Sequence, residues 1–249
     1  MPVTTERRGR VLIARLERAE KRNAMNAEMT RGLDAAMNVL EDDPELWVGV
    51  LAGAGGVFSA GSDLRDGMNN LTERGGPYGV VRRARVKPLI AAVDGLAFGG
   101  GFEMVLACDL VVASRTASFA LPEVKRGVFA LYGGPIRAAH ALPLNVAREL
   151  ALTGEPLPAE RAERLGLVNV LCEPGHTVEE ACALAERICA NSPVSVRQSL
   201  RAINQALEAS DANAWEISAD AARIVRASED TREGVAAFFE KREPRWKGR

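Results

Sequence analysis

Three short segments of the chain carry residue types that could do chemistry on a small ligand. The first, Phe58–Leu64, follows an expected strand and turns sharply at glycine. The second, Asp94–Met104, contains three successive glycines followed by Glu103, and the third, Phe119–Val124, has Glu123 directly after a proline. Taken singly, each is compatible with ordinary turns and helix starts, where glycine and acidic residues are common.

The run Gly99–Gly100–Gly101 is the most informative of these features. It leaves an expected strand and opens an expected helix, where the first N–H groups have no partner within the helix. Glycine lets a ligand atom approach the bare backbone, and the helix dipole favours negative charge there. The pattern therefore predicts a binding site for an anionic oxygen. Glu103 in the first turn is also compatible with simple stabilisation by the dipole.

The composition restricts the other classes of function. The 249 residues include 32 basic and 33 acidic side chains, so the net charge of −1 favours neither nucleic acid nor a membrane surface as partner. We expect a cytoplasmic protein, because the N-terminal residues resemble no signal peptide. No metal site is expected, since His140 and His176 lack the HExxH spacing and the four cysteines form no CxxC pair. The glycines near position 55 do not form a GxGxxG dinucleotide motif.

Alternating patterns along the chain predict an α/β fold. Strands are expected at 10–16, 47–51, 88–93, 110–113, 118–121 and 167–171, and helices at 26–40, 100–107, 145–152 and 159–165. Only helices are expected afterwards, at 177–190, 194–209, 211–227 and 231–242, with serine and proline at the breaks. Residues 1–190 would form the core and residues 191–249 a helical region that builds an oligomer, although packing within one chain is an alternative use of its apolar residues.

In this order and spacing the three segments resemble those of the enoyl-CoA hydratase/isomerase (crotonase) superfamily. The resemblance covers almost the whole chain, including the stretches Lys21–Asn26, Leu152–Gly154 and Phe238–Arg242. It implies a right-handed spiral of ββα repeats with a C-terminal helical trimerisation region. It also implies assembly into a homotrimer or a homohexamer.

The resemblance further implies roles for particular residues. The N–H groups of Ser62 and Gly100 would form an oxyanion hole for the carbonyl of an acyl-CoA thioester. Five residues would surround the adenine and pantetheine of coenzyme A: Ala24, Ala60, Ser62, Asp63 and Leu64. Arg22, Arg65 and a neighbouring subunit's Lys241 are candidates for binding its phosphates. No cofactor is implied, because coenzyme A is part of the substrate.

The function implied is hydration of a trans-2-enoyl-CoA to a 3-hydroxyacyl-CoA. Of Glu103 and Glu123, one would activate the water and the other would protonate Cα, and the sequence does not assign the two roles. Two carboxylates that share a water disfavour double ionisation, which helps to keep one of them protonated as an acid. The alternatives are a double-bond isomerase, a specialised acyl-CoA dehydratase, hydrolase or lyase, and a non-catalytic CoA-binding scaffold. Leu131 and Tyr132 are bulky where the family often has small residues, so we expect an altered water site or acyl pocket.

Overall fold

The computed structural model describes residues 2–65 and 70–248, and its centre is a six-stranded mixed sheet. Strand β1 pairs antiparallel with β2, and every further pair in the sheet is parallel. The strands in spatial order are β1 (Val3–Arg8), β2 (Val11–Leu16), β3 (Val48–Gly53), β6 (Leu89–Val93), β8 (Leu110–Ser114) and β11 (Val170–Cys172).

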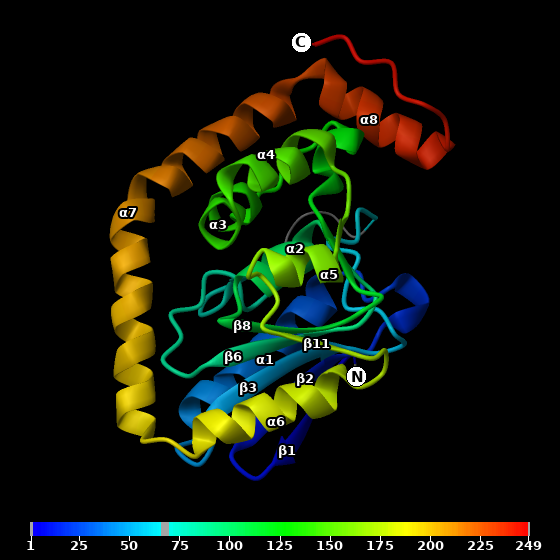
Figure 1. The fold of residues 1–249 in the computed structure, drawn as a ribbon. Helices are drawn as coiled ribbons and strands as arrows, with labels where there is room; N and C mark the ends of the chain where they lie inside the picture. Colours follow the sequence, from blue (N-terminus) through cyan, green and yellow to red (C-terminus); the bar gives the residue numbers. More distant parts are fainter. Residues whose placement is uncertain (1, 66–69, 249) are drawn as a thin grey trace.

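Both faces of this sheet are buried, as is usual for parallel strands. Along β2, Val11 and Ile13 face one apolar core, whereas Leu12, Ala14 and Leu16 face the other. Helix α6 (Thr177–Cys189) covers the first face, and α1 (Ala27–Asp42) packs against β1 and β2. Figure 1 shows these two helices alongside the strands in the lower half of the molecule.

A second, smaller sheet lies above the first. It contains β7 (Leu96–Phe98), β9 (Ser118–Ala120) and β10 (Leu157–Pro158), with β7 parallel to β9. The hairpin of β4 (Leu71–Thr72) and β5 (Gly76–Pro77) precedes β6. The short helices between these strands are η1 (Ala19–Lys21), α2 (Gly100–Leu106), η2 (Pro122–Arg126), α3 (Gly134–Ala141), α4 (Leu144–Thr153) and α5 (Ala159–Arg164).

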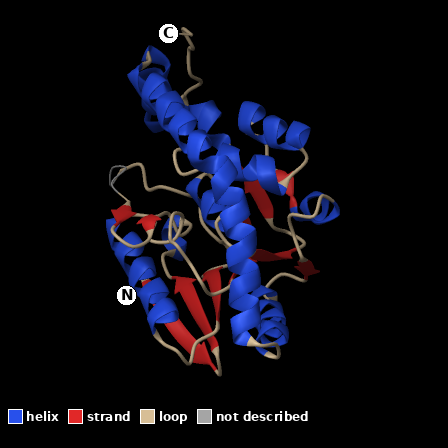
Figure 2. Cartoon of the chain, turned by 90° about the vertical axis from the view of Figure 1, so that its left-hand side faces the viewer, coloured by secondary structure: helices blue, strands red, loops and turns tan. Residues whose placement is uncertain are grey.

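Two helices complete the chain, α7 (Pro193–Ala227) and α8 (Glu229–Glu240). Helix α7 rises along one side of the molecule from α6 to α8, past α3 and α4 (Figure 1). Seen from that side, it crosses in front of the strands in the lower part and the helices in the upper part (Figure 2). Among the described residues, no helix is long and apolar enough to cross a membrane.

Most expected elements are present, and the differences have physical reasons. The expected helices at 194–209 and 211–227 are one helix, α7, because serine costs a helix only a few tenths of a kcal/mol and does not end it. Strand β11 begins at Val170 rather than at 167. Strand β1 and helix α3 were not predicted; β1 is an exposed edge strand, and α3 begins within a glycine-rich turn. The elements β4, β5, β7, β10 and η1 were not predicted either, because two or three residues are too few to show a periodic pattern.

Buried Asn23 holds together the loops that lead to the cavity. Its side chain accepts a hydrogen bond from the N–H of Arg18 (2.8 Å) and donates to the carbonyls of Ala54 (3.0 Å) and Val57 (2.7 Å). Its backbone φ of 52° is in the left-handed region that asparagine tolerates better than most residues.

We expect Asn23→Ala to lower the free energy of unfolding by about 3 kcal/mol, because it leaves buried polar groups without partners. Denaturant melts compared with those of Asn145→Ala, a change on an exposed position of α4, provide the measurement. Equal stability of the two variants would contradict this role of Asn23.

Candidate active site

Three parallel segments bring the candidate residues together. The parallel pairing of β7 with β9 aligns Phe98 with Ala120, so the two segments that follow these strands leave the sheet side by side. The first continues into α2, which has Glu103, and the second into η2, which has Glu123. The parallel bridge between Ser59 and Ala97 adds the segment that leads to Ser62 as a third neighbour. Ligand sites in α/β sheets lie at such carboxyl ends of parallel strands.

A cavity of about 890 Å³ opens over these ends. Its volume is within the usual range for small-molecule sites. It is lined by all eleven residues that the sequence singled out: Arg22, Ala24, Ala60, Ser62, Asp63, Leu64, Arg65, Gly100, Glu103, Glu123 and Lys241.

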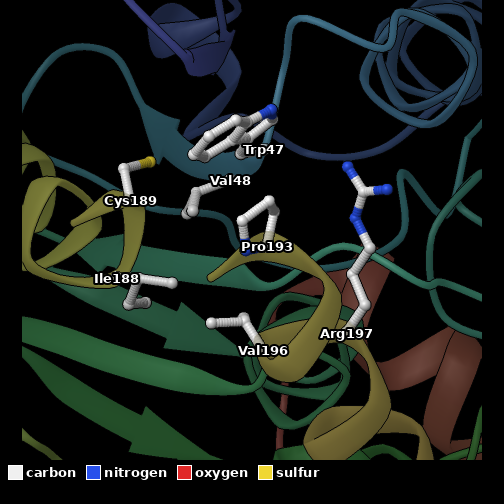
Figure 3. Close-up of a pocket in the computed structure, with 7 residues that line it drawn as sticks. All are labelled: Trp47, Val48, Ile188, Cys189, Pro193, Val196 and Arg197. Carbon is white, nitrogen blue, oxygen red and sulfur yellow. The ribbon is translucent and has the colours of Figure 1, made fainter. Parts of the chain in front are cut away.

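A much smaller hollow of about 10 Å³ lies between β3 and the junction of α6 with α7. Figure 3 shows Trp47, Ile188 and Pro193 among the side chains that line it. A space of this size holds at most a single water molecule. The candidate site is therefore the large cavity.

The backbone N–H groups of Ser62 and Gly100 both lie at the large cavity. Neither donates a hydrogen bond to any other described residue. Gly61 joins the two segments: its φ is +88°, and a Cβ there would lie 2.8 Å from the Gly100 nitrogen and 2.8 Å from the Phe98 carbonyl oxygen. Glycine at 61 is therefore required for this close approach.

Glu103 is buried, with 2% of its surface exposed, and its carboxylate is held by the backbone. Oε1 accepts hydrogen bonds from the N–H groups of Tyr132 (2.7 Å) and Gly134 (2.9 Å). Burial raises the pKa of Glu103 to about 7, and these two hydrogen bonds and the charge of Arg137 oppose that rise. A Cβ at Gly134 would lie 3.2 Å from Cγ of Glu103, so glycine keeps this loop close to the acid.

Glu123 lies beside Glu103 without comparable support. The residue as a whole is half-buried, but its Oε2 is sealed from solvent and has no hydrogen-bond partner among residues 2–65 and 70–248. Burial, and then the charge of Glu103, raise the pKa of Glu123 to about 8. A carboxyl group in such surroundings is protonated over much of the neutral range, which suits a proton donor.

Cationic side chains gather at the mouth of the cavity. Arg22, Arg65 and Lys241, the residues that the resemblance suggests for phosphate binding, are exposed there. That a neighbouring subunit's Lys241 binds the phosphates stays a prediction, and this chain's own Lys241 also lines its own cavity. The reason is that α8 packs against η2 of the same chain.

Asp63 has a structural partner that sequence reasoning did not identify. Its carboxylate forms an ion pair with Arg18 (2.8 Å) and also accepts the N–H of Arg65 (3.1 Å). Desolvation works to raise the pKa of Asp63, but the hydrogen bond and charge of Arg18 outweigh it, and the net pKa is lowered. The side chain of Asp63 thus connects the segment after Ser62 to the loop that begins at Arg18.

Several lining residues were not predicted. Tyr78 enters the cavity from the chain after β5, and Lys21, Arg126, Phe238 and Phe239 line its walls. The Phe238–Phe239 pair lies in a stretch that resembles the family, and Arg126 follows Glu123 closely, so both positions could have been found. Nothing in the spacing around Tyr78 connects it with the three segments.

Comparisons with known proteins agree with this fold. A family model described as enoyl-CoA hydratase/isomerase matches residues 6–249, and the chain belongs to this family. Its α/β crotonase fold, with a mixed sheet and C-terminal helices, is as the sequence predicts.

Individual relatives cover nearly the whole chain. It is 38% identical to the mevalonyl-coenzyme A hydratase of Aspergillus fumigatus, over 95% of this chain and 91% of that protein. It is also 38% identical to a probable enoyl-CoA hydratase of Rhizobium meliloti, over 98% and 97% of the two chains. The crystal structure of a carnitinyl-CoA hydratase from Mycobacterium avium, 43% identical, superposes with a TM-score of 0.95 over 100% of this chain and 99% of that one.

The raised pKa of Glu123 has a consequence for stability. A carboxyl whose pKa is about 8 in the folded state and near 4.5 when exposed contributes stability that is fully present below pH 4.5 and is lost as the pH rises through 8. We therefore expect Glu123→Gln to raise the melting temperature relative to the wild type at pH 9, and by much less at pH 5. The exposed Glu163→Gln is the control, and an equal effect of both changes at pH 9 would contradict the buried state of Glu123.

Proposed function

We propose that the protein adds water to a trans-2-enoyl-CoA and forms a 3-hydroxyacyl-CoA. The observation that supports this proposal most directly is the pair of acids, Glu103 and Glu123, at a cavity that also contains two free backbone N–H groups. Charge that develops on a thioester oxygen during water addition needs such preorganised donors, and one of them is typically worth about 10² to 10³ in rate. Ser62 and Gly100 supply these donors in the proposed site.

The two acids have different proposed roles. Glu103 is the base, because two N–H groups stabilise its carboxylate form. It takes a proton from water as the water oxygen bonds to C3, and the electron pair of the double bond moves to the thioester oxygen. Glu123 is the acid, because burial and the charge of Glu103 keep it protonated, and it delivers its proton to C2 on the same face. The product is the 3-hydroxyacyl thioester, with the two carboxyl groups left in exchanged protonation states.

A second candidate reaction is the reverse one, dehydration of a specialised 3-hydroxyacyl-CoA. The similarity to a carnitinyl-CoA dehydratase of Mycobacterium avium supports it, since the TM-score of 0.93 is higher than the 0.81 for the enoyl-CoA hydratase of Mycobacterium marinum at a comparable 45% identity. The same acids would serve both directions. Parallel assays with crotonyl-CoA and carnitinyl-CoA distinguish the two substrates. An isomerase is less favoured, because proton transfer between carbons needs only one acid.

We expect the rate of hydration to rise with pH through about 7, as Glu103 ionises, and to fall through about 8, as Glu123 loses its proton. Glu103→Gln and Glu123→Gln should each lower kcat by about 10² or more. The residual hydration rate of Glu103→Gln should lack the rise near pH 7, and that of Glu123→Gln should lack the fall near pH 8. The loss of enoyl thioester absorbance across a pH series measures both. If Glu103→Gln keeps full isomerisation of a 3-enoyl-CoA while the wild type hydrates no 2-enoyl-CoA, the hydratase proposal is wrong.

We also propose that residues 191–249 form an oligomerisation region and that the assembly is a trimer or a pair of trimers. The support is apolar exposure on α7, where Val194, Ile203, Ile217 and Ile224 are between 59% and 66% exposed.

The combined change Ile203→Lys and Ile217→Lys should therefore dissociate the assembly, because charged side chains would have to be buried at the interface. Val39→Lys, a matched change on α1, should leave it intact. Light scattering at micromolar concentration measures the mass, and a wild-type monomer of 26.7 kDa would contradict the proposal.

A further inference from the structure

Tyr78 is a buried tyrosine that lines the cavity and that the reaction proposed above does not use. It follows β5 with a φ of 54°, an uncommon backbone conformation for a tyrosine, and only 1% of its surface is exposed. Its N–H donates to the carbonyl of Asn70 (2.7 Å), and its ring packs edge-on against Tyr132 at 5.0 Å. Strained residues of this kind persist where the surroundings hold them in place, and they concentrate at functional sites.

The phenol of Tyr78 lies against both residues of the proposed oxyanion hole. Its oxygen is 2.6 Å from Oγ of Ser62. A Cβ at Gly100 would lie 2.1 Å from the same oxygen and 2.5 Å from Cζ of the ring. Glycine at position 100 therefore makes room for Tyr78 as well as for a thioester, and the hydroxyl group lies against both residues whose N–H groups are free.

The two hydroxyl groups have more protons than their mutual hydrogen bond uses. Ser62 and Tyr78 together have two hydroxyl protons, and either oxygen can be the donor of the one bond between them. No other acceptor for these hydroxyls occurs among residues 2–65 and 70–248. Whichever way the bond points, one proton remains to be donated. A buried donor without an acceptor is unfavourable, so this arrangement is suited to a ligand oxygen.

The phenol keeps its proton at neutral pH. Burial, and then the charge of Glu103, raise the pKa of Tyr78 well above its usual value of 10.0, and Glu123 adds to the rise. These surroundings exclude a role as a base. They leave Tyr78 as a neutral hydrogen-bond donor or acceptor.

We propose that the Ser62–Tyr78 hydroxyl pair donates a third hydrogen bond to the thioester oxygen, beside the N–H groups of Ser62 and Gly100. The inference rests on the proposed function, because it needs an acyl-CoA thioester in this cavity. No covalent bond to the pair forms or breaks, and its proton stays on the hydroxyl while negative charge grows on the substrate oxygen. The hydrogen bond strengthens as that charge develops, so its contribution is to kcat rather than to KM.

The test compares Tyr78→Phe, which removes the hydroxyl and keeps the ring, with Ser62→Ala, which keeps the backbone N–H and removes the other hydroxyl. Tyr78→Phe should lower kcat for crotonyl-CoA about 10- to 100-fold, the rate equivalent of one hydrogen bond to a charged oxygen, with KM little changed. The double variant should lose less than the product of the single losses, because the two hydroxyls act as one unit. Ser114→Ala, which removes a buried hydroxyl from the distant Ser114–Thr116 pair, is the control and should keep wild-type kcat.

A binding measurement separates this inference from the proposed function. A conjugated dienoyl-CoA absorbs at longer wavelength when its thioester carbonyl is polarised by hydrogen bonds. The wild type should shift this absorbance, and Tyr78→Phe should shift it less at an affinity within about threefold. If Tyr78→Phe shifts the absorbance as much as the wild type does and keeps the wild-type kcat, the third hydrogen-bond donor is overturned and the proposed function stands. A wild type that neither shifts the absorbance nor hydrates any 2-enoyl-CoA overturns both.

Discussion

The cavity depends on one arrangement of the backbone, the parallel pairing of β7 with β9 and the bridge from Ser59 to Ala97. Parallel strands end at the same edge, so three chain segments that are distant in sequence leave the small sheet as neighbours. The glycines at the start of α2 and Gly61 on the adjacent segment let these backbones come close. Because the strands are held in register by their hydrogen bonds, the N–H groups of Ser62 and Gly100 have positions set by the backbone.

The same arrangement places two carboxyl groups in surroundings that are costly for charge. The protein supports them unequally: Glu103 receives two backbone N–H groups, whereas Oε2 of Glu123 receives none from the described residues. This inequality separates two groups that are chemically alike, and it works through desolvation, hydrogen bonding and like charge. Burying two carboxyl groups costs the folded protein stability at this point, a cost that is common at functional sites.

Helix α7 packs against the loop that holds the carboxylate of Glu103. Trp215 on α7 packs against Gly133, where an added Cβ would lie 2.5 Å from the indole ring. The guanidinium carbon of Arg82 lies over the same ring, 4.5 Å from its centroid. Gly133 precedes Gly134, whose N–H holds Glu103. The loop that orients the buried acid is therefore confined between α2 and α7. Leu131 and Tyr132 belong to this loop and line the cavity.

The sequence by itself determined the fold class, most of the elements and the residues with candidate chemistry, because hydrophobic periodicity and glycine at strand-to-helix turns are local signals. Only the tertiary structure decided how these residues differ. Burial raises the pKa of both acids, the N–H groups of Tyr132 and Gly134, which are distant in sequence, oppose the rise at Glu103, and the charge of Glu103 adds to the rise at Glu123. Tyr78 was likewise unpredictable, since its position beside Ser62 follows from a strained backbone after β5 and from packing against Gly100, neither of which leaves a pattern in the residues around it.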